Sequence, residues 1–194
     1  NHDSSRGPMV WADTQDNPGC GGSGDTMGIV RALLAAKVKR ALVLIVYDPV
    51  SAQAAHKAGV GAKVSLQLGE KCVTDGALPL SVTATVLAVN TGSVIARGAF
   101  YRGCQLEMGL VARVSIDGVH VIIGSNNMQA ADQEMIRHLD ADPLDYSLLV
   151  LKSSVHFRAD FESISAETLV VCAPGLNIAD PSILHYREVP PQRS

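Results

Sequence analysis

The sequence has few aromatic residues, few charges and no long apolar run. Aromatic residues make up 4% and charged residues 18% of the 194 residues, whereas 47% are hydrophobic. A core of this composition is built mainly from Val, Leu, Ile and Ala. The longest apolar stretch, residues 41–47, is far shorter than the ~20 residues that a membrane-spanning helix needs. Since the net charge is −3 and no basic run occurs, nothing indicates a nucleic-acid or anionic membrane surface.

The sequence also lacks the short spacings typical of metal sites. The four cysteines are far apart and form no C-x-x-C pair; they are Cys20, Cys72, Cys104 and Cys172. We therefore expect reduced thiols, a cytoplasmic location and no zinc ribbon. No two histidines have H-x-x-x-H spacing, so we expect no metal site built from this chain alone. The polar N-terminus gives no indication of a signal peptide.

The first third of the chain alternates between strand and helix patterns. Residues 41–47 are a continuous apolar run, typical of a strand that is covered on both faces. Before this run, a strand candidate at residues 9–12 is followed by a loop and by a helix that we expect Asp25 to cap. After it, Asp48 and Pro49 predict the start of a second helix. This alternation predicts βαβ units and a parallel sheet.

The middle of the chain, residues 63–125, has the pattern of short strands and turns. Its clearest piece is residues 112–123, where Asp117 and Gly118 predict a two-residue type I′ turn. In the register that this turn sets, apolar residues face each other across the hairpin in three pairs: Ile116 with Val119, Val114 with Val121, and Ala112 with Ile123. Helix and strand patterns alternate again afterwards. The sequence therefore predicts an α/β fold with a mixed sheet, flanking helices and an antiparallel β-rich insertion. The domain is expected to cover residues 9–194, after an arm or linker at residues 1–8.

A glycine-rich loop lies between the first strand and the first helix. It partly matches the dinucleotide-binding fingerprint G-x-G-x-x-G, but several residues separate the strand from Gly19. It fails the phosphate-loop template because Asp25 stands where a lysine should contact phosphate. Two interpretations remain open: a turn that only links strand to helix, or a backbone surface that approaches a ligand closely. The candidate residues are Asp16, Asn17, Gly19, Gly21, Gly22, Gly24, Asp25 and Thr26.

A second candidate segment, residues 151–158, follows a buried strand and enters a helix. In open α/β sheets ligands bind beyond the carboxyl ends of strands, so this segment is expected to share an edge with the glycine loop. Lys152, Ser154, His156 and Arg158 offer a cation, a hydroxyl and a proton carrier. A Ser–His nucleophile pair also needs an orienting acid, which the sequence does not identify. The alternative interpretation makes a serine the helix cap and Arg158 a surface charge.

These two segments resemble the signature motifs of the C-terminal domain of MlrC-like proteins. The first motif lies at residues 12–19 (ADTQDNPG) and 24–26 (GDT), and the second at residues 149–158 (LVLKSSVHFR). Shorter similar pieces are YDP at 47–49, the Ala55-His56 pair with GVGA at 59–62, and APG at 173–175. The resemblance covers nearly the whole chain from about residue 8, in the expected order.

The resemblance implies a zinc-dependent metallopeptidase or related amidohydrolase. The family's named member cleaves linearised microcystin, a peptide toxin, and the metal ligands are attributed to an N-terminal domain. This chain would then be the half that carries no metal and shapes the substrate cleft. It would be inactive when isolated. Its expected partners are the N-terminal metal-binding domain of the same protein and a peptide or amide substrate. The twelve candidate residues would line the cleft, with no catalytic role assigned to any of them.

Two other functions stay open from the sequence. One is a self-contained anion- or nucleotide-binding module that uses the loop between Gly19 and Gly24. The other is a structural oligomerisation domain, since a mean hydropathy of +0.18 suits a domain that covers surface with a partner such as a second copy of itself. Phosphate binding by the isolated chain would favour the first, and a concentration-dependent dimer the second.

Overall fold

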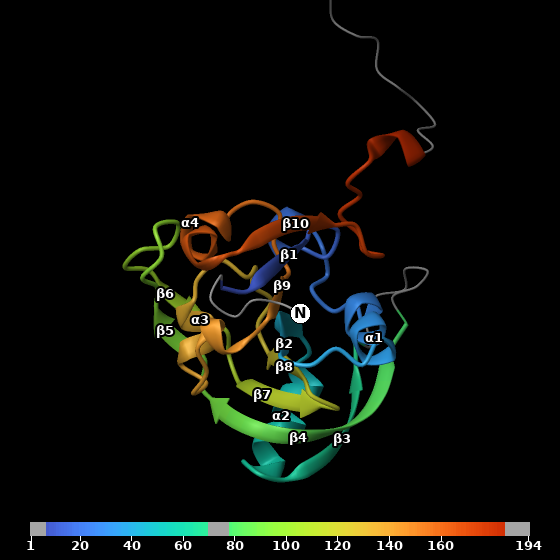
Figure 1. Cartoon of the computed structure of the whole chain (residues 1–194). Helices are drawn as coiled ribbons and strands as arrows, with labels where there is room; N and C mark the ends of the chain where they lie inside the picture. The colour runs from blue at the N-terminus through green and yellow to red at the C-terminus, as the bar shows by residue number, and fades with distance from the viewer. Residues whose placement is uncertain (1–6, 70–77, 185–194) are drawn as a thin grey trace, which may run out of the picture.

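The computed structural model describes residues 7–69 and 78–184, which build one eight-stranded sheet with helices around it (Figure 1). The strand order is β10-β1-β9-β2-β8-β7-β4-β3, and β5 and β6 form a separate pair. The strands are β1 (Met9–Asp13), β2 (Ala41–Tyr47), β3 (Lys63–Leu68), β4 (Leu80–Asn90), β5 (Ser93–Ile95), β6 (Gln105–Glu107), β7 (Val111–Ile116), β8 (Val119–Gly124), β9 (Leu148–Leu151) and β10 (Glu167–Val171). The mixed α/β fold predicted from the sequence is confirmed.

Five neighbouring strands of the sheet run parallel: β10, β1, β9, β2 and β8. All four residues of β9 and the first six of β2 are buried, because their continuous apolar sequences suit strands that are covered on both faces. Parallel strands end at the same edge of a sheet. The chain leaves β1 at Asp13 and β9 at Leu151 on this edge, which we call the carboxyl edge.

The other half of the sheet is antiparallel, in the order β8-β7-β4-β3. The predicted hairpin is confirmed in its register, with Ile116 opposite Val119 and Val114 opposite Val121. Asp117 and Gly118 have φ angles of +48° and +90°, as a type I′ turn requires. The predicted β-rich region continues the main sheet, because β8 pairs in parallel with β2.

Helices cover both faces of the sheet and enclose two apolar cores. The helices are α1 (Gly28–Ala35), α2 (Pro49–Ala58), α3 (Glu134–Arg137) and α4 (Arg158–Phe161). One core joins α1 and α2 to the sheet, and the other joins α3, α4 and β6 to the opposite face. Successive side chains of a strand point to opposite faces, so β2 places Val43 in the first core and Leu42 in the second.

The two long helices begin for different reasons. The carboxylate of Asp48 accepts a hydrogen bond from the Ser51 N–H at 2.9 Å, which confirms the predicted cap of α2. The expectation that Asp25 caps α1 is wrong, because this helix begins only at Gly28 and has no side-chain cap. None of the described helices is long and apolar enough to cross a bilayer.

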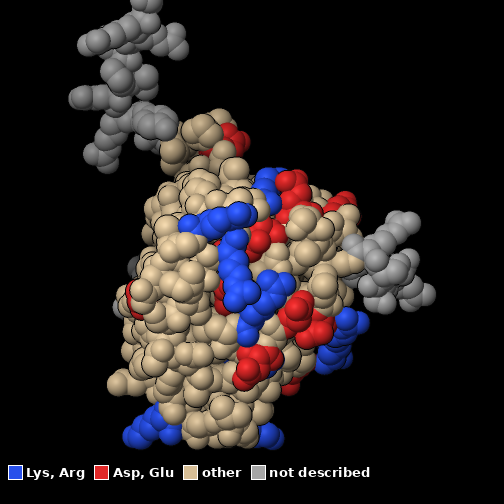
Figure 2. Space-filling model, turned by 90° about the vertical axis from the view of Figure 1, so that its left-hand side faces the viewer, with Lys and Arg blue, Asp and Glu red and all other residues tan. Residues whose placement is uncertain are grey.

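Charged side chains of both signs gather on the face that carries α3, α4 and the β5–β6 pair. Figure 2 shows a band of Lys and Arg side chains there, with Asp and Glu side chains beside it. The ion pairs of these two helices include Arg137 with Asp142 at 3.6 Å and Arg158 with Glu162 at 3.2 Å. The basic side chains of α3 and α4 are therefore partly neutralised by neighbouring acids.

The buried sheet is expected to dominate stability. Val121 in β8 is fully buried, so Val121→Ala should lower the free energy of unfolding by about 2–3 kcal/mol through lost burial and a residual cavity. Val50→Ala is the matched control, because this side chain is 65% exposed and its truncation should change stability by less than about 0.5 kcal/mol. Urea denaturation measures both variants. Equal losses of unfolding free energy in the two variants would contradict the burial of Val121 in the core.

Candidate functional site

A buried cluster of three charges lies at the carboxyl ends of β1 and β9. Asp13 ends β1, and Lys152 directly follows β9 in the neighbouring position of the sheet. The Lys152 Nζ lies 3.2 Å from Asp13 Oδ2 and forms a second ion pair with Asp16 Oδ2. It also donates a hydrogen bond to the Thr26 carbonyl at 3.2 Å. The three charged side chains are at most 2% exposed. We call Lys152, Asp13 and Asp16 the Lys152 cluster.

Asp16 ties the Lys152 cluster to the glycine-rich loop. One carboxylate oxygen accepts from the Gly24 N–H at 2.7 Å and from the Ser23 hydroxyl at 3.2 Å. The other accepts from the N–H and the hydroxyl of Thr26 at 2.9 and 2.8 Å. Glycine-rich loops before helices use such N–H groups to bind anions. Here a carboxylate of the chain itself takes that position, and its bonds hold residues 24–27 as a loop, which delays the start of α1.

The N–H groups of residues 19–22 are also bonded within the loop. The Gly19 N–H donates to the Asn17 side chain at 2.9 Å. The N–H groups of Cys20 and Gly22 donate to the Asn17 carbonyl at 3.0 and 2.9 Å, and Gly21 donates to the preceding turn. Residues 19–22 therefore present no free row of donors to an external phosphate.

Two glycines of the loop are required by close packing. A Cβ atom at Gly22 would lie 2.6 Å from the backbone nitrogen of Asn17 and from the carbonyl carbon of Asp16. At Gly24 the φ angle is +75°, and a Cβ would lie 2.9 Å from the Pro18 ring. These contacts explain part of the glycine content by packing alone.

The charges of the Lys152 cluster shift one another's protonation. Burial alone would raise the pKa of Asp16, but the Lys152 ammonium and the bonds from Thr26 hold it below its usual value. Burial outweighs Lys152 at Asp13 and raises the pKa of that carboxyl. Burial opposes the charge of Lys152, yet the two carboxylates raise its pKa above the ordinary value. Lys152 and Asp16 thus stay ionised at neutral pH, and Asp13 is protonated first as the pH falls.

The Lys152 cluster does not fit a divalent metal ion. Its two carboxylates hold the Lys152 ammonium, whose positive charge would repel a second cation at the same place. Within residues 7–69 and 78–184, no group of three or more His, Cys, Asp or Glu side chains is arranged to hold a metal. No reaction step is therefore assigned to a metal held by this cluster.

The half-buried Ser154 hydroxyl joins the second segment to the loop. Its oxygen accepts from the Thr14 hydroxyl at 2.7 Å and from the Asn17 amide at 3.0 Å. The same Asn17 amide lies 3.2 Å from the exposed thiol of Cys20. The Ser154 hydroxyl bonds to Thr14, Asn17 and Cys20, so it does not form a Ser–His nucleophile pair with His156.

The exposed ring of His156 is held by two neighbours, Phe100 and Gln129. It stacks on Phe100 with centroids 3.9 Å apart and ring planes 14° from parallel. Its Nδ1 lies 3.1 Å from Gln129 Oε1, and the Gln129 amide donates to the Tyr101 hydroxyl at 2.9 Å. A Cβ at Gly19 would lie 2.4 Å from Gln129 Oε1, so glycine leaves room for this side chain. We call His156, Phe100, Gln129 and Tyr101 the His156 platform.

The twelve residues predicted for the site separate into two groups, although the two segments meet directly at the carboxyl edge. The buried group supports the edge from inside and consists of Asp16, Asn17, Gly22, Gly24, Asp25, Thr26 and Lys152. The accessible or partly accessible group consists of Gly19, Gly21, Ser154, His156 and Arg158. Arg158 pairs with Glu162 and lies over the Phe157 ring at 5.4 Å, as a surface charge would.

Several residues of the site were not predicted. A signal for Asp13 existed. It is an acid at the end of one strand, Lys152 follows another strand, and an acid and a lysine at the same edge of a sheet suggest an ion pair. Thr14, Phe100, Tyr101 and Gln129 carry no such signal. They come from three separate segments, and only the folded chain brings them to Ser154 and His156.

The fold and the site define the class of the protein: a mixed α/β domain whose carboxyl edge is closed by a buried ion cluster. The same fold occurs in the crystal structure named "Putative metallopeptidase" from Mesorhizobium sp. BNC1, with a TM-score of 0.83 and 24% sequence identity. The match covers 92% of this chain and 36% of that one. At this identity the likeness shows the fold alone.

The chain belongs to the family described as MlrC C-terminus, whose model matches residues 11–188. Microcystinase C of Sphingomonas sp. is 29% identical over 183 residues, which cover 93% of this chain and 34% of that protein. The chain thus spans about a third of the length of both relatives. The resemblance stated from the sequence motifs is confirmed.

Removing the central cation should destabilise the fold strongly. Lys152→Met leaves Asp13 and Asp16 buried side by side without a counter-charge, and we expect the free energy of unfolding to fall by about 3–5 kcal/mol. Lys57→Met removes an exposed ammonium and should cost less than about 0.5 kcal/mol. Both are measured by urea denaturation. A loss for Lys152→Met no larger than that of the control would contradict the role of the cluster.

Proposed function

We propose that this chain forms the C-terminal half of an MlrC-like zinc metallopeptidase or related amidohydrolase, and that its carboxyl edge shapes one side of the substrate cleft. The proposal is supported by the family match over residues 11–188 and by the metallopeptidase named among the structural relatives. In this division, zinc and its ligands belong to an N-terminal domain of the same protein. The relatives are long enough to include one, since the chain covers 34% and 36% of them.

The observation that carries the proposal is the His156 platform. An exposed histidine ring would normally sample several rotamers, but here one face is covered by Phe100 and one nitrogen is bonded to Gln129. Ser154 accepts a hydrogen bond from Asn17 of the glycine loop, and Asp16 of the same loop pairs with Lys152. A substrate-binding edge needs side chains that are accessible and already oriented, because orientation contributes much of the rate acceleration.

In the proposed cleft, His156 acts as a hydrogen-bond acceptor for the substrate. Gln129 accepts at Oε1 while its amide nitrogen donates to Tyr101, so Nδ1 of His156 carries the proton in the neutral ring. The second ring nitrogen, Nε2, is then bare and can accept from a peptide N–H. Phe100, which is 41% exposed, offers an apolar face beside it. Arg158 is available to a substrate carboxylate.

The buried residues have a different role in this proposal. Lys152 and Asp16 contact each other and the loop from inside the domain, so they position the edge without contacting the substrate. The zinc chemistry of a metallopeptidase would be supplied by the other half. The residues of this chain contribute binding and orientation.

The two alternative functions receive unequal support. A nucleotide-binding module through the glycine loop would need free N–H groups, and the N–H groups of residues 19–22 are bonded within the loop. A structural docking domain is favoured by the edge strand β10, where Leu169 and Val170 are 40% and 58% exposed. A dimer that forms as concentration rises, with no effect of platform variants on activity, would favour this second function.

The proposal predicts a loss of activity without a loss of metal. In the full-length protein, His156→Ala should lower kcat/KM for a mixture of short linear peptides at least about tenfold, because one oriented contact to the substrate is lost. Hydrolysis is followed by mass spectrometry, and bound zinc is quantified on the same sample. The zinc content should stay that of the parent protein.

Lys63→Ala is the control, because Lys63 is exposed on β3 at the far end of the sheet. It should leave kcat/KM unchanged. An unchanged kcat/KM in His156→Ala would show that the platform does not face the substrate.

A further inference from the structure

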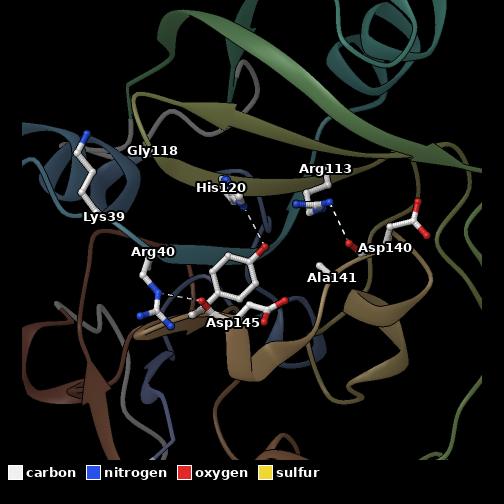
Figure 3. A pocket seen from close by; sticks show the side chains of 9 residues that line it. Lys39, Arg40, Arg113, Gly118, His120, Asp140, Ala141 and Asp145 are labelled. Carbon is white, nitrogen blue, oxygen red and sulfur yellow. Dashed lines mark hydrogen bonds between the residues drawn. The ribbon is translucent and has the colours of Figure 1, made fainter. Parts of the chain in front are cut away.

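A hollow in the surface lies at the edge of the sheet opposite the Lys152 cluster. It has a volume of about 360 Å³ and lies where the chain enters β2 and β8, with Lys39, Arg40, Arg113, His120 and Tyr146 around it (Figure 3). This volume falls within the range of small-molecule sites. The seven residues of β2 separate the two edges by about 20 Å. The hollow is therefore independent of the function proposed above.

Three cations flank the hollow, and each is held by a backbone carbonyl. Lys39 donates to the Asp117 carbonyl at 2.6 Å, and Arg40 donates through Nε to the Asp145 carbonyl at 3.0 Å. Arg113 donates to the carbonyls of Leu139 and Asp140. A guanidinium has five N–H donors, so both arginines keep further donors for another partner. Figure 3 shows Lys39 and Arg40 on one side of the hollow and Arg113 on the other.

Two acidic residues, Asp140 and Asp145, also border the hollow. The carboxylate of Asp145 closes its own turn, where it accepts from the Asp142 N–H at 3.3 Å. Figure 3 shows the carboxylate of Asp140 pointing away from the ring of His120. The three cations around the hollow thus outnumber its two carboxylates.

The rings of His120 and Tyr146 are hydrogen-bonded to each other beside the hollow. Their Nδ1 and hydroxyl oxygen lie 2.9 Å apart. Burial, together with Arg113, lowers the pKa of His120, and burial raises the pKa of Tyr146. Both rings are therefore neutral at pH 7, and the pair adds no negative charge to the hollow.

We propose that this hollow binds a small organic anion through a carboxylate or phosphate group. Lys39, Arg40 and Arg113 supply the opposite charge, and their N–H groups supply charge-assisted hydrogen bonds. The ring of Tyr146 and the methyl group of Ala141 supply apolar contact for the body of the ligand. Three cations against two carboxylates give the hollow a local positive charge, although the net charge of the chain is −3.

The test titrates inorganic phosphate and citrate separately into the protein by calorimetry at low ionic strength. Saturable binding of at least one probe is expected, and it should weaken as salt is added. Lys39→Gln with Arg40→Gln should reduce the affinity about tenfold. Lys57→Gln with Lys63→Gln removes the same two charges from exposed positions elsewhere and should change the affinity less than about twofold. Since all four side chains are exposed, each variant is expected to fold.

Amide chemical shifts locate the bound probe. Shifts at Gly118 and His120 support the hollow, and binding of only one probe identifies the group recognised as phosphate or carboxylate. Shifts confined to residues 19–24 would overturn the proposal in favour of the glycine loop. No saturable binding of either probe, or equal losses in the two double variants, would also overturn it.

Discussion

Three charges buried at the ends of β1 and β9 hold the candidate site together. Taking an ion out of water costs several kcal/mol, and this cost is offset only when its partners are well placed. Lys152 therefore needs Asp16, and Asp16 needs the donors of Gly24 and Thr26. Asp13 Oδ1 has no hydrogen-bond partner among the described residues, so it is the least satisfied point of this network.

This network bonds the carboxyl edge internally, so the N–H groups of residues 19–22 form no free row of donors for a phosphate. The N–H groups that could bind an external anion are used by Asp16 and Asn17, and the carboxylates that could bind a metal hold Lys152. What remains accessible is a fixed imidazole beside an aromatic ring and a hydroxyl. In the proposed function, this edge binds and orients a substrate, and the other domain would supply the reactive group.

Features that depend on neighbouring residues could be predicted from the sequence. The hairpin register follows from alternating apolar residues around Asp117 and Gly118, and the start of α2 follows from Asp48 and Pro49. The family motifs also predicted the carboxyl edge, because each motif is a continuous segment that includes the end of a strand. Asp25 was misassigned because the amides of residues 24 and 26 bind a carboxylate eight to ten positions away. The Gln129–His156 contact spans 27 residues, and no local pattern encodes it.

The metal content of the chain tests the proposed division of labour most directly. The purified chain is incubated with zinc and desalted, and bound zinc is quantified while hydrolysis of a peptide mixture is followed. We expect no stoichiometric zinc and no hydrolysis, because the carboxylates of the Lys152 cluster are engaged by an ammonium. One tightly bound zinc per chain together with peptide hydrolysis would contradict this division, and the histidines and acids of this chain would then form the catalytic centre.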